Sequence, residues 1–543
     1  MVLKDRRHNG HMFGWTLAFF YTSGTMSKSL FFPLSVLCLT VTVMSSEQTQ
    51  QTRPVEPTRV QSTRVQTMRP EIVGTHGIVA AGRHYSVAAG VRILQEGGNA
   101  IDAGVASVFA ASVVEISHFG FGGEVPTMIY DAKTKKVIVI NGQGTAPKQA
   151  TPELFAKKGK VDSNGPLGAT LPAVMDAMAL ALQNYGTMRL EQVMAPAIEL
   201  ADGFPMYEFL RTNFINERKA TEQWEWSKKT YYPDGHIPEV GEIFRQPNLA
   251  RTLRTIVAAE KSAWEKTKDR KAAILAGRDA FYKGDIGRRI ADADRAAGGV
   301  FTVDDLANFK GKIEEPVKTT FHGIEVYKAG PWNQGPVLLQ TLNILEGIDL
   351  AALKQNSADY IHNVHEAIKL AYDDRNAFYG DPDFVGVPII GLLSKDYAAE
   401  RRALIGKQAS LEIRPGNPFK YDPRVKAPAT PYIPHSQGEK NDDYEAGDTT
   451  CVDVVDKDGN LFSATPSSGW LLGGAFIAGD TGVPLSNRMQ VFDLDPKSPN
   501  VLVGESVLAR RSLPAYCLRM GNRFSPSAHR AATVRISKYS TCF

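Results

Sequence analysis

A chain of 543 residues with 43% hydrophobic and 22% charged residues has the composition of a soluble globular protein. It can hold two or three ordinary domains, or one large two-layer domain with helical cover. Sixty-two basic residues face 58 acidic ones, and both signs are spread along the chain, which excludes an electrostatic footprint for nucleic acid or an anionic membrane surface.

The N-terminal region has the features of an export signal. Residues 30–44 (LFFPLSVLCLTVTVM) form an uncharged apolar run, preceded by Lys28 and followed by two serines. A membrane-spanning helix needs roughly 20 apolar residues, so this run indicates a secretory signal rather than an uncleaved anchor, which is the alternative. We expect residues 1–46 to be an upstream extension and signal peptide, with Met26 as a natural start. The protein is then exported, periplasmic or secreted, without a stable membrane span.

A polar linker and two helices come next. Residues 47–72 are rich in Gln, Thr and Arg and cannot bury enough surface to become ordered, so the globular part begins near Val73. Residues 86–96 have apolar residues at helical spacing. Asn99 then caps a second helix, with Asp102 placed to reach back to the free amides. The many alanines and the glycine of this helix predict that it packs closely against other backbone, inside a layer.

The middle of the chain is predicted to be mostly helical. Two short strands, 128–130 and 137–140, precede it, and residues 360–378 form its clearest amphipathic helix. His362, His365 and Glu366 on that helix are in the wrong order for a zincin motif, so we interpret them as a polar helix face and expect no metal.

A polar loop and a hairpin follow. Residues 407–446 are rich in Pro, Asp and Lys without an apolar period, which predicts a long exposed loop. Residues 451–465 alternate as two strands around an Asp-Gly turn, a hairpin signal. The aspartates near that turn loosely resemble a calcium loop, but their alternation is broken and no bidentate glutamate closes it, so a turn is preferred.

Thr449 stands where this loop meets the first strand of the hairpin. A Thr hydroxyl is a poor nucleophile unless a base lies beside it. If the peptide bond after Asp448 is cut, the α-amine of Thr449 becomes that base, with a pKa of about 7.7–8.0. On the pattern alone, Asp-Thr-Thr before a strand is more often a turn and cap.

From about Val73 to Asn522 the sequence resembles the γ-glutamyltranspeptidase family of N-terminal-nucleophile hydrolases. The resemblance rests on segments that occur in the same order: EGGNAIDAGVA (96–106), GFGGE (120–124), APAIELADGFP (195–205), FYKGDIG (281–287), DDLANF (304–309), HEAIKLAYDDR (365–375), GDTTCVDVVDKDGNLFSAT (447–465) and the turn at Gly473 and Gly474.

The resemblance implies an α+β fold, a four-layer αββα sandwich. It implies a large subunit (73–448) and a small subunit (449–522) that form a heterodimer after the chain cuts itself between Asp448 and Thr449. Thr449 matches the family nucleophile, and Thr450 and Ser467 match hydroxyls that steady the nucleophile and its amine. The matching substrate-binding positions are Gln143, Ser468, Gly473 and Gly474. The implied partners are a small amide or peptide substrate and a water or amine acceptor, without any cofactor or metal.

Three departures from the family concern the substrate rather than the chemistry. Gln143 replaces the arginine that grips the α-carboxylate of a glutamyl group, Gly469 replaces an asparagine, and Val491 replaces the acidic residue that holds the α-amine. Each lost charge-assisted contact should cost about 1.5–3 kcal/mol of binding. The expected function is therefore transfer or hydrolysis of a γ-glutamyl (glutathione-like) or related acyl group. An acylase or amidohydrolase with a non-glutamyl substrate is the alternative.

The C-terminal tail departs from the family altogether. Back-translation of residues 525–543, read from the third base of each codon, permits the family's Thr-Pro-Gly-Gly-Asp turn. We therefore interpret 523–543 as an out-of-frame tail, with the last strands of the small subunit missing or garbled. A nucleotide sequence incompatible with the shifted frame would remove the frameshift hypothesis. An inactive, truncated family member is a third alternative, which predicts no cleavage before Thr449.

Overall fold

In the computed structural model, the residues described are 74–428, 432–433, 449–469, 472–507 and 516–518. They form an antiparallel sheet of six strands in the order β1-β9-β10-β2-β3-β6. These strands are β1 (Gly77–Ala81), β9 (Val452–Asp456), β10 (Leu461–Ala464), β2 (Thr127–Asp131), β3 (Lys136–Asn141) and β6 (Lys312–Glu314). A second sheet has the order β11-β8-β7, and a short pair joins β4 to β5. Their bounds are β11 (Tyr516–Leu518), β8 (Ile324–Lys328), β7 (Val317–Phe321), β4 (Phe204–Pro205) and β5 (Ile243–Phe244).

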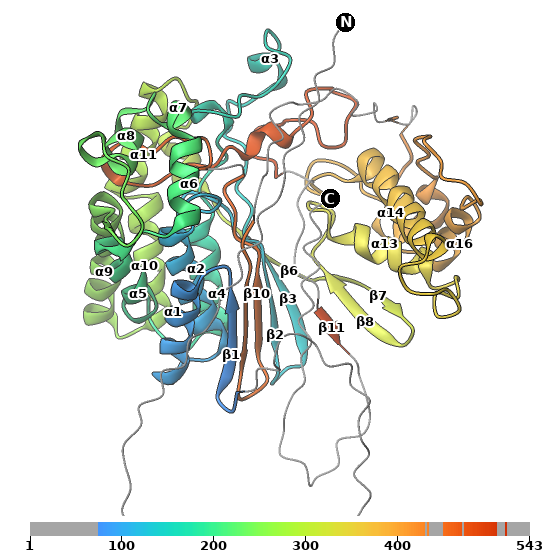
Figure 1. Ribbon diagram of the computed structural model, residues 1–543, viewed down its shortest axis with the longest axis horizontal. Helices are drawn as coiled ribbons and strands as arrows, with labels where there is room; N and C mark the ends of the chain where they lie inside the picture. Colours follow the sequence, from blue (N-terminus) through green and yellow to red (C-terminus); the bar gives the residue numbers. More distant parts are fainter. Residues whose placement is uncertain (1–73, 429–431, 434–448, 470–471, 508–515, 519–543) are drawn as a thin grey trace, which may run out of the picture. The chain divides into compact units, whose positions relative to one another are not determined.

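Helices cover both outer faces of the two sheets (Figure 1). On the outer face of the six-stranded sheet, and around its end, lie α1 (His84–Gln95), α2 (Ala100–Val114), α3 (Pro152–Phe155), α4 (Val174–Tyr185), α5 (Leu190–Asp202), α6 (Glu208–Asn216), α7 (Arg218–Thr221), α8 (Glu225–Tyr231), α9 (Pro247–Thr267), α10 (Arg270–Tyr282), α11 (Asp285–Ala296) and α12 (Val303–Asn308). Beside the second sheet lie α13 (Gly335–Leu345), α14 (Ala358–Phe378), α15 (Ile389–Leu392) and α16 (Lys395–Arg402). The α+β prediction of four αββα layers is confirmed.

Strand alternation decides which residues enter which layer. Successive side chains of a strand point to opposite faces. In the central hairpin, Val452, Val454 and Phe462 enter the core under the helices, whereas Leu461 enters the core between the sheets with Trp332. The hairpin is therefore apolar on both faces, as expected for strands buried in the middle of a sandwich.

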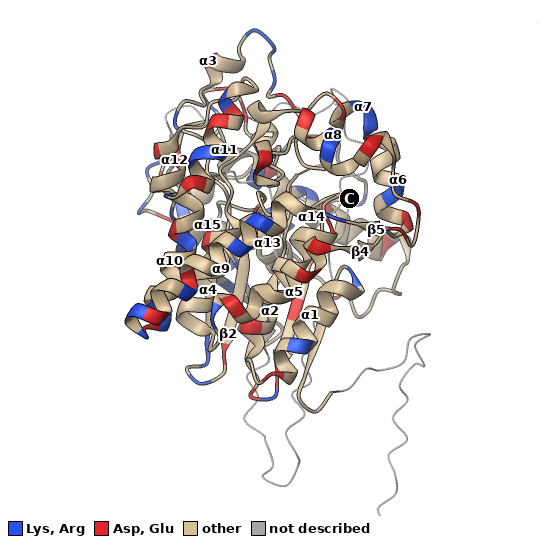
Figure 2. Ribbon diagram, turned by 90° about the vertical axis from the view of Figure 1, so that its left-hand side faces the viewer, with Lys and Arg blue, Asp and Glu red and all other residues tan. Residues whose placement is uncertain are grey.

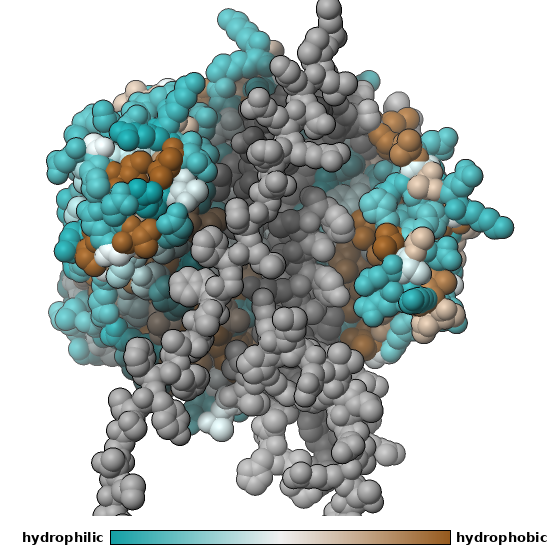
Figure 3. Space-filling model, in the orientation of Figure 1, coloured by the Kyte–Doolittle hydropathy of each residue, from teal (hydrophilic) through white to brown (hydrophobic). Residues whose placement is uncertain are grey.

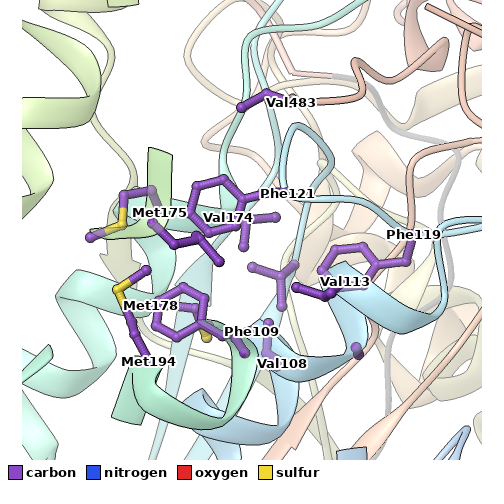
Figure 4. Packing of buried hydrophobic residues seen from close by; sticks show 14 of the residues in the cluster. Val108, Phe109, Val113, Phe119, Phe121, Val174, Met175, Met178, Met194 and Val483 are labelled. Carbon is purple, nitrogen blue, oxygen red and sulfur yellow. The ribbon is translucent and has the colours of Figure 1, made fainter. Parts of the chain in front are cut away.

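Helix α2 is the centre of the larger core, and each of its residues is buried. Its start is fixed by the predicted capping box: Asn99 Oδ1 accepts from the amide of Asp102, and Asp102 Oδ2 accepts from the amide of Asn99. Figure 4 shows Val108, Phe109 and Val113 packed with residues of α4 and α5, including Val174, Met175, Met178 and Met194. The predicted close packing is confirmed at Gly104, where an added Cβ would lie 2.2 Å from the ring of Phe462.

The prediction of a mostly helical middle region missed β6, β7 and β8. These strands have only three to five residues and carry charged or Thr side chains, so they offer no apolar run to detect. On the polar face predicted for α14, Glu366 is buried and paired with Lys369 and Arg414. The exposed loop predicted over 407–446 is wrong at Asp422, which is fully buried and accepts from the amide of Ile390.

The helical face carries both charge signs side by side. Figure 2 shows acidic and basic residues interspersed over α1, α4, α5, α9 and α10. Figure 3 shows a mostly hydrophilic described surface, with small groups of hydrophobic residues over the helices on both sides. None of the described helices is long and apolar enough to cross a membrane.

We predict that Gly104→Ala destabilises the fold by about 1–3 kcal/mol, although alanine is about 1 kcal/mol better than glycine in a helix. The new methyl group would collide with the buried Phe462 ring. Urea denaturation measures the change in the free energy of unfolding. Gly406→Ala is the control, because nothing lies within 4 Å of its added Cβ; equal stability of the two variants would contradict the packing described for α2.

Candidate active site

The six strands of the β1-β9-β10-β2-β3-β6 sheet, here called the central sheet, end together along one edge that runs across the strands. The register aligns one residue from each strand in a single row: Ala81, Val452, Ala464, Thr127, Ile140 and Ile313. Just beyond this row lie Gly82, Thr450, Thr465 and Asn141. Segments from distant parts of the chain, including 449–451, 465–468 and 141–143, therefore meet at this edge of the sheet.

Thr449 and Thr450 precede β9 at this edge. Thr449 is exposed, whereas Thr450 is 3% exposed and its Oγ1 has no hydrogen-bond partner among the described residues. Strand β9 itself begins at Val452, three residues later than Thr449. Asp448, on the other side of the predicted cut, lies outside the described residues.

Ser467 is fully buried and lies in an internal charged network. Its backbone pairs with Glu124 in an isolated antiparallel bridge. Its hydroxyl accepts a hydrogen bond from Arg488 Nη2 at 2.9 Å, while Arg488 Nε donates to Glu124 Oε1 at 2.6 Å. Removing an arginine and a carboxylate from water is favourable only with such pairing. The pair therefore fixes the Ser467 hydroxyl relative to the strand ends.

The predicted substrate-binding residues Ser468, Gly473 and Gly474 contact neighbouring backbone. The Ser468 hydroxyl accepts from the amide of Gly120 at 2.9 Å. Gly473 has φ of +59°, and a Cβ there would come within 2.3 Å of the Leu485 carbonyl oxygen. The amide of Gly474 donates to that same oxygen at 3.2 Å. These glycines allow a tight turn that brings the segment against Ser468.

Gln143 follows β3 and reaches the same edge. The amide of Val125 donates to the carbonyl oxygen of the neighbouring Gly142, and Glu124 is bridged to Ser467. Gln143 is 2% exposed, and both polar atoms of its amide lack a partner among the described residues. The residue lines a cavity of about 580 Å³ together with Lys148, Lys310 and Asp381. Burial raises the pKa of Asp381.

The predicted turn after β9 is confirmed. Asp456 Oδ1 accepts from the amides of Asp458 and Asn460, and its Oδ2 accepts from the amide of Ala100 at the start of α2. No group of three His, Cys, Asp or Glu residues suited to a metal occurs in the described part of the chain.

Sequence reasoning missed three charged residues at this edge: Glu115, Glu124 and Arg488. All are buried, with side chains at most 9% exposed. Glu115 follows the apolar helix α2, and a charge at the end of an apolar run is the signal that could have singled it out. The Arg488–Glu124 contact joins residues 364 positions apart, and no local pattern indicates it.

Comparison with known proteins gives a consistent result. The family model described as gamma-glutamyltranspeptidase matches residues 86–521. The chain is 32% identical over 442 residues to the glutathione hydrolase proenzyme of Bacillus subtilis (strain 168), covering 79% of this chain and 70% of that protein. It is 31% identical over 462 residues to the acylase ACY 1 proenzyme of Pseudomonas sp. (strain SE83), covering 82% and 75%.

The solved structure of a cephalosporin acylase from Bacillus halodurans is similar with a TM-score of 0.70 at 28% identity, covering 84% of this chain and 77% of that one. The predicted fold type, that of the N-terminal-nucleophile hydrolases, is thereby confirmed.

We predict that Arg488→Met lowers the free energy of unfolding by about 3–5 kcal/mol, because it leaves the buried Glu124 without its guanidinium partner. The double variant Arg488→Met/Glu124→Gln should recover part of that loss. Urea denaturation provides the measurement. Arg92→Met is the matched control, since Arg92 makes exposed ion pairs with Glu96 and Glu199, worth about 1 kcal/mol or less. Similar losses in both single variants would contradict the role assigned to Arg488.

Proposed function

Because this chain belongs to the gamma-glutamyltranspeptidase family, we propose that it is a self-processing amide hydrolase or acyltransferase with Thr449 as nucleophile. The observation that carries the proposal is the row of strand ends. It brings an exposed threonine at the start of the central hairpin to the same edge as the buried Ser467 hydroxyl. A nucleophile at a strand end can approach a substrate while the sheet holds its neighbours rigid.

The proposed chemistry needs no cofactor. Thr449 Oγ attacks the Asp448 carbonyl carbon, and the bond from that carbon to the Thr449 nitrogen breaks, which leaves an ester and a free α-amine. Water then hydrolyses the ester and restores the Thr449 hydroxyl. That amine then accepts the hydroxyl proton when Thr449 attacks an amide substrate, and water or an amine resolves the acyl-enzyme. Thr450 and Ser467 are proposed to steady the nucleophile and its amine. Ser468, Gly473 and Gly474 are proposed to shape the wall against which substrate lies.

The acyl group is proposed to lack a carboxylate at the position facing Gln143. The Gln143 amide is buried with both polar atoms unpartnered among the described residues, so its nitrogen can donate hydrogen bonds and its oxygen can accept them. It is neutral, and it cannot form a bidentate ion pair with a carboxylate. This favours an acylase that takes a neutral or polar acyl group. The ACY 1 relative is, by its name, an acylase. Hydrolysis of γ-glutamyl compounds, the class of the glutathione hydrolase relative, is the second candidate.

The remaining proposals concern the chain as a whole. Processing would give a large subunit ending at Asp448 and a small subunit beginning at Thr449, held together as a heterodimer. Export is proposed on the apolar run at 30–44 alone, which lies outside the described residues. The tail at 523–543 also lies outside them. An uncut purified chain would favour the inactive alternative, and restoring the tail to the family frame would then separate a damaged tail from a wrong nucleophile.

We predict that the purified protein contains a fragment with the N-terminal sequence Thr-Thr-Cys-Val-Asp, and that Thr449→Ala yields one uncut chain. Loss of the hydroxyl removes the attacking group of both steps. Intact mass and N-terminal sequencing measure the result. Thr465→Ala, on the neighbouring strand end, is the control and should still be cut. Cleavage of Thr449→Ala at the same bond would contradict the assignment.

We predict that Gln143→Arg increases kcat/KM for a γ-glutamyl anilide at least 10-fold relative to a neutral acyl anilide. A bidentate arginine–carboxylate contact contributes about 1.5–3 kcal/mol. Parallel hydrolysis assays with the two anilides measure the ratio. Gln149→Arg places the same charge on an exposed residue lining the same cavity and should leave the ratio within about twofold. An unchanged ratio in Gln143→Arg would show that position 143 does not face the acyl group.

A further inference from the structure

The proposed mechanism leaves its first step without a base. During turnover the α-amine of Thr449 accepts the hydroxyl proton. Before processing, that nitrogen is part of the peptide bond to Asp448 and has no lone pair available for a proton. The attack on the Asp448 carbonyl therefore requires another proton acceptor near the start of β9. The inference that follows rests on the proposed function and concerns this step.

Glu115 is a buried carboxylate at an unfavourable position. It is the C-cap of α2, where the helix dipole disfavours a negative charge, and it is 0% exposed. Its Oε1 accepts from Ser86 Oγ at 3.0 Å, and its Oε2 lies 3.2 Å from His118 Nε2. His118 in turn contacts Ser117 Oγ through Nδ1 at 2.8 Å. A buried acid at the negative end of a helix lowers stability, so its presence favours a functional role.

The same carboxylate faces Thr450. A Cβ built on Gly82 would lie 2.3 Å from Glu115 Oε2 and 2.2 Å from Thr450 Oγ1. Both oxygens thus lie next to Gly82, which follows β1 and has no side chain. Thr450 Oγ1 is buried and has no partner in the described structure. A small rotation of either side chain would let this hydroxyl donate to Glu115.

Three other charged or titratable residues lie near Glu115 or its neighbours: Arg83, Tyr207 and His118. Arg83 precedes α1, and its guanidinium lies 5.0 Å from the ring centre of Tyr207 and 4.6 Å from that of Phe209. Tyr207, before α6, is close enough to Glu115 and Arg83 for both to influence its pKa, which burial raises. His118 is the third. Of these groups, His118 contacts the Glu115 carboxylate directly, and that carboxylate in turn lies beside the Thr450 hydroxyl.

We infer that Glu115, acting through the Thr450 hydroxyl, accepts the proton of Thr449 Oγ in the self-processing step. The Thr449 Oγ–H bond breaks, Oγ bonds to the Asp448 carbonyl carbon, and the proton moves through Thr450 to the Glu115 carboxylate. The bond between that carbon and the Thr449 nitrogen then breaks, and the nitrogen takes the proton to become the α-amine. Water hydrolyses the ester, which releases the Asp448 carboxylate and restores the Thr449 hydroxyl.

The experiment measures the rate of chain cleavage in freshly refolded or newly translated full-length protein. Glu115→Gln keeps the shape of the side chain but is not a base, and we expect processing to slow about 10²- to 10⁴-fold. Thr450→Val, which removes the relaying hydroxyl at nearly constant shape, should slow it similarly, whereas Thr450→Ser should remain within about 10-fold of wild type. Glu199→Gln is the control, since Glu199 is exposed and pairs with Arg92.

Two further measurements exclude a merely structural role. Because Glu115 and Thr450 act in one path, the double variant Glu115→Gln/Thr450→Val should be no slower than the slower single variant. Hydroxylamine cleaves an ester but cannot form one, so it should not restore processing of Glu115→Gln. Restoration by hydroxylamine would place Glu115 at ester hydrolysis and overturn the inference, as would additive effects of the two substitutions.

The possible outcomes separate the inference from the proposed function. If wild type is cut before Thr449 and Glu115→Gln is cut equally fast, the inference is wrong and the proposed function stands. If wild type remains whole and also remains whole with its tail restored to the family frame, the proposed function fails, and the inference fails with it. Both the inference and the proposed function are supported if Glu115→Gln is processed slowly but has a normal urea midpoint. Its processing must also be insensitive to hydroxylamine, and its effect must not add to that of Thr450→Val. If Glu115→Gln unfolds, the two Thr450 variants test the inference: slow processing of Thr450→Val together with near-normal processing of Thr450→Ser supports it, and equal rates in the two variants contradict it.

Discussion

The register of the β9–β10 hairpin is the constraint on which the rest of this structure depends. The hairpin enters the middle of the sheet between β1 and β2, whose residues precede it by more than 300 positions. A slip of one residue would turn Val452, Val454 and Phe462 out of the helical core and move every neighbouring side chain to the opposite face. Asp456 opposes such a slip, because its carboxylate joins the hairpin turn to the first amide of α2. The position of Thr449 at the sheet edge follows from this register.

Glu115, Glu124 and Arg488 are buried at that edge. Arg488 and Glu124 hold Ser467, and Glu115 lies beside Thr450 at the end of α2. Each of these groups is unfavourable in a core of small and aliphatic residues unless it is paired. These three residues lie at one end of the sheet, where the strands give way to loops. Other buried ion pairs, such as Arg278–Asp176, lie among the helices.

Local sequence patterns predicted much of this arrangement. The helices at 86–96, 99–115 and 360–378 and the hairpin at 451–465 are confirmed, because apolar periodicity, the Asn99 cap and the Asp-Gly turn act within a few residues. The second sheet was missed, because short half-exposed strands such as β7 carry no apolar run. The site was predicted only in part. Thr449, Ser467 and Gln143 came from a family resemblance, whereas the contacts of Arg488 and Glu115 arise from residues brought together by the sheet.

The insertion of the hairpin between β1 and β2 has a consequence for the two products of a cut before Thr449. The smaller piece would supply two central strands of a sheet whose outer strands belong to the larger piece. Neither piece could leave without exposing the core on both faces of the sheet, so the two would remain interlocked without any covalent bond. Such a molecule would behave on dilution as one folding unit, and its parts would separate only by unfolding.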